Sequence, residues 1–358
     1  FIFFMVDIIG LLLYTLPIKS QEVSMSTKLN LLEILNNNTT SYLSGQDLAA
    51  RLGLSRNSIW KAIKTLQNEG FEIDSKAGVG YRLLKKNDVL SPSYIRDAAG
   101  IKCRVHILDE VDSTNNYAKK LTDLSCPGIV IANSQTEGRG RLGRSFYSPH
   151  SKGLYMSMVF EPDFSLDRSM MVSSIAALSV CRAFEEVIGL GPKIKWVNDI
   201  YLNGKKVCGI LTEAETNFET GSISRIIVGV GVNCFEQSFP EELAEKASYV
   251  TGAPRDFTRS QLAAAIIRYF FTTLEEFDKR TILRDYRSRS LILGEQILVY
   301  GASYGALPEN GGQGIKARAI DIDENGGLVV EYMEGRHARE MDTITSGEVT
   351  IRKDVSAR

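Results

Sequence analysis

The stretch IKWVNDIYLNGKKVCGIL, residues 194–211, decides the architecture of the largest part of the chain. Residues 194–196 are typical of a strand. A hairpin is expected over residues 201–208, because its middle contains Asn203-Gly204, and Asn-Gly is the strongest short turn signal. The hairpin folds the segment after it back beside the first strand. The stretch therefore predicts neighbouring strands joined by tight turns.

Lys195 is the unusual residue of this stretch, because it alternates with the apolar Ile194 and Trp196. Burying an ammonium group is costly unless it meets an anion. Gly209, on the segment that folds back, would let a ligand approach the backbone. The alternative is an edge-strand lysine paired with a carboxylate such as Asp199.

Strands and helices alternate around this stretch over residues 88–288, which predicts a central mixed α/β domain. A long apolar helix is expected at residues 168–188, a strand at 223–232 and a helix-rich segment at 259–277. Short, evenly spaced strands are expected after it, at residues 296–300, 315–322, 328–332, 339–343 and 349–352. They predict a small β-barrel over residues 289–358, so the whole chain is expected to be an α+β protein.

Residues 25–87 have the pattern of a winged helix-turn-helix. Leucines recur at helical spacing over residues 29–35. Ser44 and Ser55 are expected to cap the next two helices, with Gly53 in the turn between them. Two short strands are expected next, at residues 71–73 and 81–84.

The last of these helices carries a basic face. Arg56 lies at its start, and Asn57, Lys61 and Lys64 share one side. This face fits insertion into the major groove of DNA, with the lysines on phosphates. The alternative is a small helical domain with an ordinary solvated basic face.

Composition limits the class of protein. The chain has 358 residues, a net charge of −1, five cysteines and three histidines. The cysteines are scattered without a Cys-x-x-Cys pair, which favours reduced thiols in a cytosolic protein. The histidines form no ligand-spaced cluster, so histidine–metal chemistry is not expected. Any contact with DNA must come from a local basic patch, because the overall charge is not basic.

The N-terminus reads FIFFMVDIIGLLLYTLP over residues 1–17, and it is apolar except for Asp7. It is slightly short for a membrane span and has no positively charged segment before it. Met25 opens a sequence that looks like a cytosolic start. We expect residues 1–24 not to belong to the working protein; the alternative is a genuine anchor or signal.

The most unusual segment is GRGRLGR, residues 138–144, with three glycines and three arginines. Its physical use is to close over an anion, with guanidinium groups on phosphate or carboxylate oxygens and backbone amides nearby. The alternative is a solvated basic loop or a nucleic-acid contact. The chain contains no Gly-x-x-x-x-Gly-Lys-Ser/Thr motif, so this loop is the best candidate to hold a nucleotide.

Two weaker signals complete the set. Residues 112–115, Asp-Ser-Thr-Asn, precede a helix whose N-cap is expected to be Ser113, and together they make a donor-rich ligand site. Residues 229–233, Gly-Val-Gly-Val-Asn, end a strand, and their glycines suggest a close approach to the backbone.

Taken in order, the segments EVDSTN, QTEGRGRLGR, KWVNDIYLNGKKVCGILTE and GVGVN resemble the bacterial family of bifunctional biotin–protein ligases and biotin-operon repressors. The resemblance runs from about Met25 to the C-terminus. It implies a winged DNA-binding head, a catalytic domain like that of class II synthetases and an SH3-like C-terminal barrel. The sequence departs from the family pattern at Leu142, commonly an arginine, and at Val197, commonly a proline.

The resemblance also implies roles for individual residues. The catalytic residues would be Lys195 and Arg141. The biotin site would comprise Ser113, Thr114, Asn115, Gln135, Arg139, Gly140, Arg141, Lys195, Gly209 and Leu211. The nucleotide would contact Arg144, Phe146 and Asn233. DNA would contact Gly45, Ser55, Arg56, Asn57, Lys61 and Lys64. No metal ligand is implied.

The implied reaction uses ATP and Mg²⁺ to activate biotin as an adenylate and then transfers biotin to a lysine. The acceptor would be the biotin carboxyl carrier protein of acetyl-CoA carboxylase. The other implied partners are operator DNA and a second copy of the chain in the adenylate-bound state. A cytoplasmic location and no membrane partner are expected. The alternatives are a lipoate-type ligase and a transcription factor that senses a small acid without chemistry.

Overall fold

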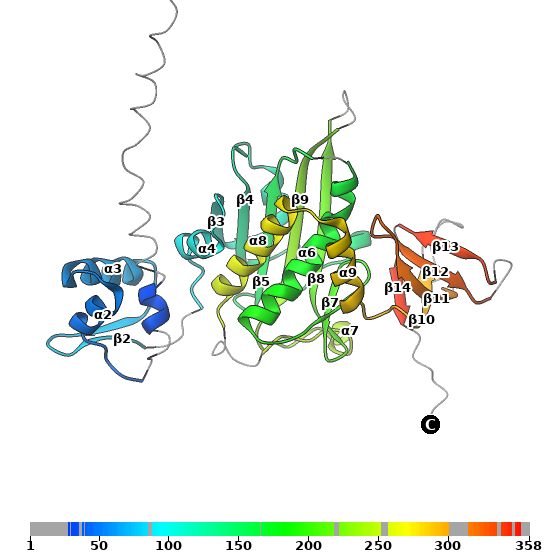
Figure 1. Ribbon diagram of the computed structural model, residues 1–358. Coiled ribbons are helices and arrows are strands. Elements are labelled where there is room, and N and C mark those ends of the chain that lie inside the picture. The colour runs from blue at the N-terminus through cyan, green and yellow to red at the C-terminus, as the bar shows by residue number, and fades with distance from the viewer. Residues whose placement is uncertain are drawn as a thin grey trace, which may run out of the picture. The chain divides into compact units, whose positions relative to one another are not determined.

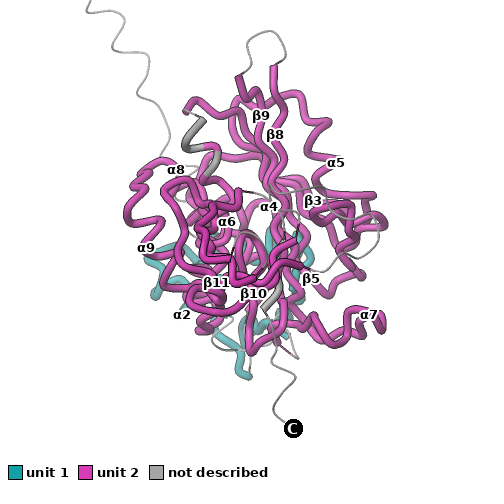
Figure 2. Tube along the Cα trace, turned by 90° about the vertical axis from the view of Figure 1, so that its right-hand side faces the viewer, with its two compact units in different colours: residues 1–89 teal, residues 90–358 magenta. Residues whose placement is uncertain are grey.

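In the computed structural model, the chain forms two compact units within residues 1–89 and 90–358 (Figure 2). The structure describes residues 28, 30–35, 38, 40–84, 88–164, 166–217, 222–251, 257–300, 314–334, 338–345 and 348–351. The apolar leader at residues 1–24 lies outside these residues, so the expectation about it stays a prediction. Across the described ranges, no helix is long and apolar enough to cross a membrane.

The first unit is a helix-turn-helix followed by a two-stranded hairpin. Its elements are α2 (Gly45–Leu52), α3 (Arg56–Asn68), β1 (Ile73–Lys76) and β2 (Gly80–Leu83). The hydroxyl of Ser44 accepts a hydrogen bond from the amide of Asp47, and that of Ser55 accepts one from Ser58. Gly53 ends α2 in the left-handed conformation, with φ of 65°. The predicted caps and turn are therefore confirmed.

The first strand of the hairpin was predicted too early, at residues 71–73. Phe71 is buried, and its amide donates to the carbonyl of Leu66 at 3.0 Å, so this residue closes the end of α3. The strand begins only at Ile73. An apolar residue that seals the end of a helix has the same sequence pattern as the start of a strand.

The second unit is built on a seven-stranded mixed sheet with the order β3-β4-β5-β9-β8-β7-β6 (Figure 1). The strands are β3 (Arg104–Val111), β4 (Gly128–Gln135), β5 (Gly153–Phe160), β6 (Lys193–Lys195), β7 (Asp199–Leu202), β8 (Lys205–Thr216) and β9 (Ile223–Asn233). Only the β3–β4 pair is parallel among the described pairs. The hairpin predicted around Asn203-Gly204 is confirmed as β7–β8.

The helices of this unit cover the sheet unequally. They are α4 (Pro92–Ala99), α5 (Thr114–Lys119), the single 3-10 turn η1 (Arg141–Gly143), α6 (Leu166–Val187), α7 (Glu241–Ala244), α8 (Arg259–Glu275) and α9 (Lys279–Arg289). The long helices α6 and α8 lie on one face of the sheet, and α5 lies on the other (Figures 1 and 2). Successive residues of a strand point to opposite faces of the sheet. On β4, Ile129 and Ile131 therefore join the large core, and Val130 between them joins the small core under α5.

The helix-rich segment predicted at 259–277 is confirmed as α8, and a further helix, α9, follows it from Lys279. Phe277 interrupts the pattern, and the side chain of Asp278 accepts from the amide of Arg280 to start α9. This second helix was missed, although an aspartate before a new helical run is a typical start signal.

The chain ends in a five-stranded antiparallel sheet with the order β13-β12-β11-β10-β14. Its strands are β10 (Gln296–Tyr300), β11 (Ile315–Ile322), β12 (Leu328–Tyr332), β13 (Met341–Ile344) and β14 (Glu348–Ile351). Apolar residues such as Ile297, Val330 and Ile344 belong to the same core as α6 and the large sheet. The boundary expected between residues 288 and 289 lies inside the second unit and stays a prediction.

Candidate active site

A cavity of about 940 Å³ lies over the strands that carry the predicted motifs. Its floor is the sheet face opposite α6. Ile210 on β8 and Val228 and Val230 on β9 join the large core beneath α6. Their neighbours along each strand therefore face the cavity. The cavity is lined by every residue of the predicted biotin site and by two of the three predicted nucleotide contacts: Ser113, Thr114, Asn115, Gln135, Arg139, Gly140, Arg141, Lys195, Gly209, Leu211, Arg144 and Phe146.

Strand register brings the distant motifs into one row. Across five strands, Tyr155 pairs with Gly231, Gly231 with Gly209, Gly209 with Asp199 and Asp199 with Lys195. Residues that are paired across a sheet share a face, so Gly209 and Gly231 lie between the side chain of Tyr155 and those of Asp199 and Lys195. Lys195 and the Gly-x-Gly motif are therefore parts of a single surface.

The glycines form a floor for an aromatic ring. A Cβ atom on Gly231 would lie 2.6 Å from Phe146, and one on Gly209 would lie 3.4 Å from the same ring. Phe146 also meets Tyr155 edge to face, with ring centroids 6.4 Å apart. The weak Gly-x-Gly signal thus has a concrete cause, since only glycine leaves room for Phe146 at this position.

One end of the cavity is a network of neutral polar groups at the start of α5. The side-chain oxygen of Gln135 accepts from the amide of Thr114 at 2.9 Å and lies 3.1 Å from its hydroxyl. The hydroxyl of Ser157 lies 2.6 Å from the side-chain oxygen of Asn115. Ser113 occupies the N-cap position, but its side chain makes no capping bond. The predicted capping role was therefore wrong, because Gln135 from β4 takes it over.

Gly229 should not tolerate even one added methyl group. An alanine Cβ there would lie 2.4 Å from the side-chain oxygen of Asn115. We expect Gly229→Ala to displace Asn115 and to raise the KM for the ligand of this end by at least about tenfold, because its hydrogen bonds would be lost or misaligned. Steady-state kinetics with each substrate varied in turn will measure it. Gly191→Ala is the matched control, because a Cβ there has no neighbour within 4 Å.

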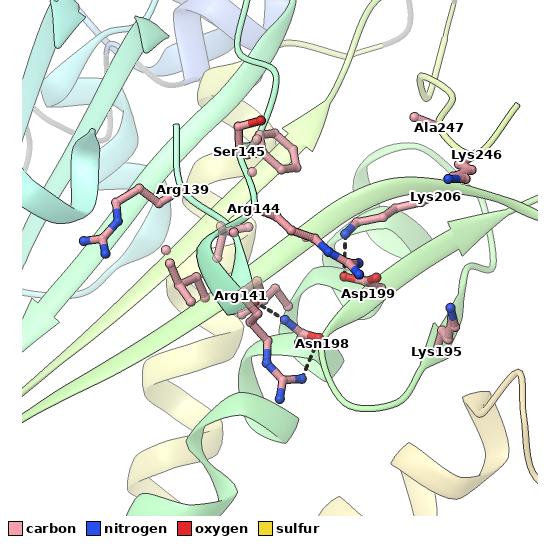
Figure 3. Close-up of a pocket in the computed structure, with 18 of the residues that line it drawn as sticks. Arg139, Arg141, Arg144, Ser145, Lys195, Asn198, Asp199, Lys206, Lys246 and Ala247 are labelled. Atoms are coloured by element: carbon pink, nitrogen blue, oxygen red, sulfur yellow. Dashed lines mark hydrogen bonds and ion pairs between the residues drawn. The ribbon is translucent and has the colours of Figure 1, made fainter. Parts of the chain in front are cut away.

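The other end of the cavity is cationic (Figure 3). A guanidinium nitrogen of Arg141 lies 3.4 Å from the side-chain oxygen of Asn198, which links the glycine–arginine loop to the β6–β7 connection. The ammonium of Lys195 lies 5.8 Å from the centre of the Tyr201 ring. Asp199 forms an ion pair with Lys206, with 2.7 Å between the charged atoms.

Lys206 is a cavity residue that the sequence reasoning missed. It lies on β8 and faces the same cavity as Lys195 on β6. A lysine at the start of a hairpin strand has no special pattern in sequence. Its position beside the loop arginines becomes visible only once β7 and β8 are paired.

Segments from the end of the chain hold the strand that carries Lys195. The indole nitrogen of Trp196 donates to the carbonyl of Gly326 at 2.9 Å. The hydroxyl of Tyr286 donates to the carbonyl of Val197 at 3.0 Å, and the amide of Leu291 donates to Ile194 at 2.8 Å. The C-terminal sheet thus helps to position the cationic end. The peptide bond before Val197, the residue that departs from the family's proline, is cis.

Asn233 does not line this cavity. It lies at the end of β9, is 5% exposed, and donates to the carbonyl of Ser248 at 3.1 Å. Its buried side-chain oxygen has no hydrogen-bond partner in the described part of the chain. A contact of Asn233 with a nucleotide therefore stays a prediction.

The residues predicted to contact DNA lie in the first unit, and four of them share the exposed side of α3: Arg56, Asn57, Lys61 and Lys64. No ion pair of Arg56, Lys61 or Lys64 is found within the described ranges. Trp60, which the sequence reasoning missed, is 49% exposed on the same helix. The hydroxyl of Ser55 caps the N-terminus of α3 by accepting from the amide of Ser58, and Gly45 is the first residue of α2.

A metal site of protein side chains alone is not apparent. Within the part of the chain that the structure describes, no group of three or more His, Cys, Asp or Glu residues could hold an ion. The five cysteines, all within the described ranges, form no disulfide bond, and burial raises the pKa of Cys103 to about 11 and that of Cys181 to about 12.

Known proteins share this architecture. Residues 107–233 match the biotin/lipoate A/B protein ligase family, and residues 27–82 match an HTH domain. The chain is 33% identical to the bifunctional ligase/repressor BirA of Bacillus spizizenii over 315 residues, which cover 86% of this chain and 94% of that protein. It is 28% identical to BirA of Escherichia coli, covering 86% and 95% of the two chains.

A solved protein structure has a similar fold. The biotin protein ligase from Aquifex aeolicus in complex with biotin and ATP matches with a TM-score of 0.54 and 28% identity. The match covers 70% of this chain and 98% of that one. With the helix-turn-helix, the glycine-floored cavity and relatives matched over nearly their whole length, the chain belongs to the family of bifunctional biotin protein ligases and repressors.

Proposed function

We propose that this protein activates biotin with ATP to biotinyl-5′-AMP and transfers biotin to a lysine of a biotin carboxyl carrier protein. One observation carries the proposal: a single cavity joins a neutral polar end at Thr114 and Asn115 to a cationic end at Arg141 and Lys195. A neutral ureido ring with a carboxylate tail fits such a cavity in one orientation. Its carboxylate then reaches the cations.

The first step joins two anions. A carboxylate oxygen of biotin attacks the α-phosphorus of ATP, the bond to the bridging oxygen breaks, and pyrophosphate leaves. Repulsion between the reactants must be neutralised where they meet, and Lys195 and Arg141 supply positive charge on that part of the wall. We propose that Phe146, on its floor of glycines, contacts the adenine.

A phosphate-bound Mg²⁺ ion is compatible with this wall. Magnesium in nucleotide sites is held by one or two carboxylates together with phosphate oxygens and water. Asp199 and the side-chain oxygen of Asn198 line the cationic end and would hold it. The ion would neutralise charge on the phosphates.

In the second step, a lysine amine of the carrier protein attacks the acyl carbonyl of the adenylate, and AMP leaves. Until then, the mixed anhydride must be kept from water. Residues 138–144 have the composition to close over it. Backbone bonds tie the base of this loop, from Gly140 to the carbonyl of Arg144 at 2.7 Å and from Phe146 to Gly138 at 2.8 Å.

The decisive experiment is transfer of labelled biotin to an isolated carrier domain. Label should appear on the carrier only with ATP present, together with release of pyrophosphate. The same assay with labelled lipoate tests the lipoate-ligase alternative. Absence of any biotin-dependent pyrophosphate release would leave a ligand sensor without chemistry.

We also propose that the adenylate-bound protein forms a homodimer that presents two heads to a two-fold operator. The exposed cations of α3 support DNA contact. The five cysteines, which form no disulfide bond among the described residues, support a cytoplasmic location. The short antiparallel strands β10 to β14 support the assignment of the C-terminal sheet to an SH3-like barrel.

Lys61→Ala and Lys64→Ala should weaken DNA binding similarly for all sequences. Each lysine removed from a phosphate should lower the slope of log affinity against log salt by about one. Fluorescence anisotropy with labelled duplex at several salt concentrations will measure it. Lys102→Ala, which removes one exposed positive charge from the second unit, is the control. Equal slopes for all three variants would contradict the assignment of α3 to DNA.

A further inference from the structure

Glu213 lies beneath the polar end of the cavity without lining it. It is on β8, on the same face as Gly209 and Leu211, and its side chain is 22% exposed. Three side chains from other segments converge on its carboxylate. The amide nitrogen of Asn115 donates to it at 2.8 Å, the ammonium of Lys119 at 2.9 Å, and a guanidinium nitrogen of Arg139 lies at 3.6 Å.

The carboxylate decides which way the Asn115 amide points. An ionised carboxylate can only accept hydrogen bonds, so it requires the NH₂ group of Asn115 to face it. The side-chain oxygen of Asn115 then faces the hydroxyl of Ser157, at 2.6 Å. A glutamine at position 213 would offer both a donor and an acceptor, and it would no longer select one orientation.

The same carboxylate decides where the first arginine of the loop lies. Arg139 points away from Arg141 and Arg144 (Figure 3). Its guanidinium also donates to the side-chain oxygen of Asn116 on α5, at 3.2 Å. Arg139 therefore ties the start of the loop to α5 through Glu213, whereas Arg141 and Arg144 remain on the cationic side.

The charge of Glu213 persists in this setting. Burial on its own would raise the pKa of Glu213. Hydrogen bonds from Lys119 and Asn115, together with the charges of Lys119 and Arg139, outweigh burial and leave the pKa below its ordinary value. The group is thus an acceptor at neutral pH, as the orientation of Asn115 requires.

We propose that Glu213 is a positioning residue for biotin specificity: it fixes the polarity of the Asn115 amide and anchors Arg139 to α5, without touching the substrate. The inference rests on the proposed placement of the biotin ring at this end of the cavity. A ureido ring carries its hydrogen-bond donors and its acceptor at fixed places. If the side-chain amide of Asn115 were turned over, with its oxygen and nitrogen exchanged, like groups would face each other and repel the ring. The nucleotide half of the cavity does not depend on this network.

The test compares Glu213→Gln with Glu215→Gln. Glu215 is two residues along the same strand and face, but its side chain is 42% exposed, against 22% for Glu213. Among the ion pairs of the described residues, Glu215 pairs with Arg225 alone, at 3.7 Å. We expect Glu213→Gln to raise the KM for biotin about 10- to 100-fold, the range for a lost hydrogen bond to a charged group. The KM for ATP should stay within about twofold. Glu215→Gln should change neither.

Two further measurements exclude a merely structural role. In the Asn115→Ala background, Glu213→Gln should raise the biotin KM by much less than it does alone, because its effect passes through Asn115. Thermal midpoints of all variants will report folding. If Glu213→Gln does not fold, Glu213→Asp and Glu215→Asp carry the same comparison, since the charge is kept and only the reach is shortened.

The outcomes separate two failures. Equal increases in both KM values, or an effect no larger than that of Glu215→Gln, would overturn the role of Glu213. Additive effects of Glu213→Gln and Asn115→Ala would do the same. Absence of biotin-dependent pyrophosphate release from the unmodified protein would instead overturn the proposed function.

Discussion

Replacing Lys195 with alanine is expected to lower the rate of adenylate formation by about 10²- to 10³-fold, the usual cost of removing one group that stabilises developing charge. Lys195 lies in the row that also holds Asp199, Gly209 and Gly231, so its ammonium faces the place where the two reacting anions meet. Biotin-dependent release of pyrophosphate measures the effect. The transfer step from chemically prepared biotinyl-5′-AMP should fall much less.

Lys193→Ala is the matched control for this loss. Lys193 lies on the same strand two residues earlier, and it is exposed. Among the hydrogen bonds of the described residues, its ammonium donates only to the carbonyl of Ser288, at 3.5 Å. Normal turnover by Lys195→Ala, or an equal loss in Lys193→Ala, would remove Lys195 from the chemistry. Lys195→Arg should restore little, because a planar guanidinium does not reproduce a compact ammonium.

The predictions from sequence succeeded where local chemistry decides the structure. Caps at Ser44 and Ser55 and the turn at Asn203-Gly204 depend on residues within one turn of the chain. The motif residues also converged, because each motif lies at the end of a strand or at a helix start. The pairing of β6 (Lys193–Lys195) with the other strands of the large sheet then places these motif residues on one face of that sheet.

Contacts that depend on long-range register could not be predicted. Glu213 meets Asn115 and Lys119 across 98 and 94 residues of sequence, and nothing around any of the three indicates the others. The capping role predicted for Ser113 was wrong for the same reason. The side chain of Gln135, which lies on β4, accepts the hydrogen bond from the amide of Thr114 at the start of the helix. Side chains with several possible partners are assigned only by the tertiary structure.

Arg141→Gly is expected to speed release of biotinyl-5′-AMP from the protein by about 10- to 100-fold. The change removes a cation that would pair with the phosphate and also the contact to Asn198 that holds the loop to the β6–β7 connection. Each loss of a charge-assisted hydrogen bond weakens binding by about tenfold or more. A filter assay with labelled adenylate gives the rate, and labelling of a bystander protein reports escape of the reactive intermediate.

Leu142→Gly separates the charge from the flexibility of the loop. Leu142 has a φ of 55° and is 58% exposed, so glycine relieves an uncommon conformation and removes no charge. If faster release came from flexibility alone, Leu142→Gly would match Arg141→Gly. We expect Leu142→Gly to stay near the unmodified protein, because the anion is retained by the guanidinium of Arg141 and by its tether to Asn198. Unchanged retention in Arg141→Gly would show that the remaining cations, Arg144 and Lys195, suffice to hold the adenylate.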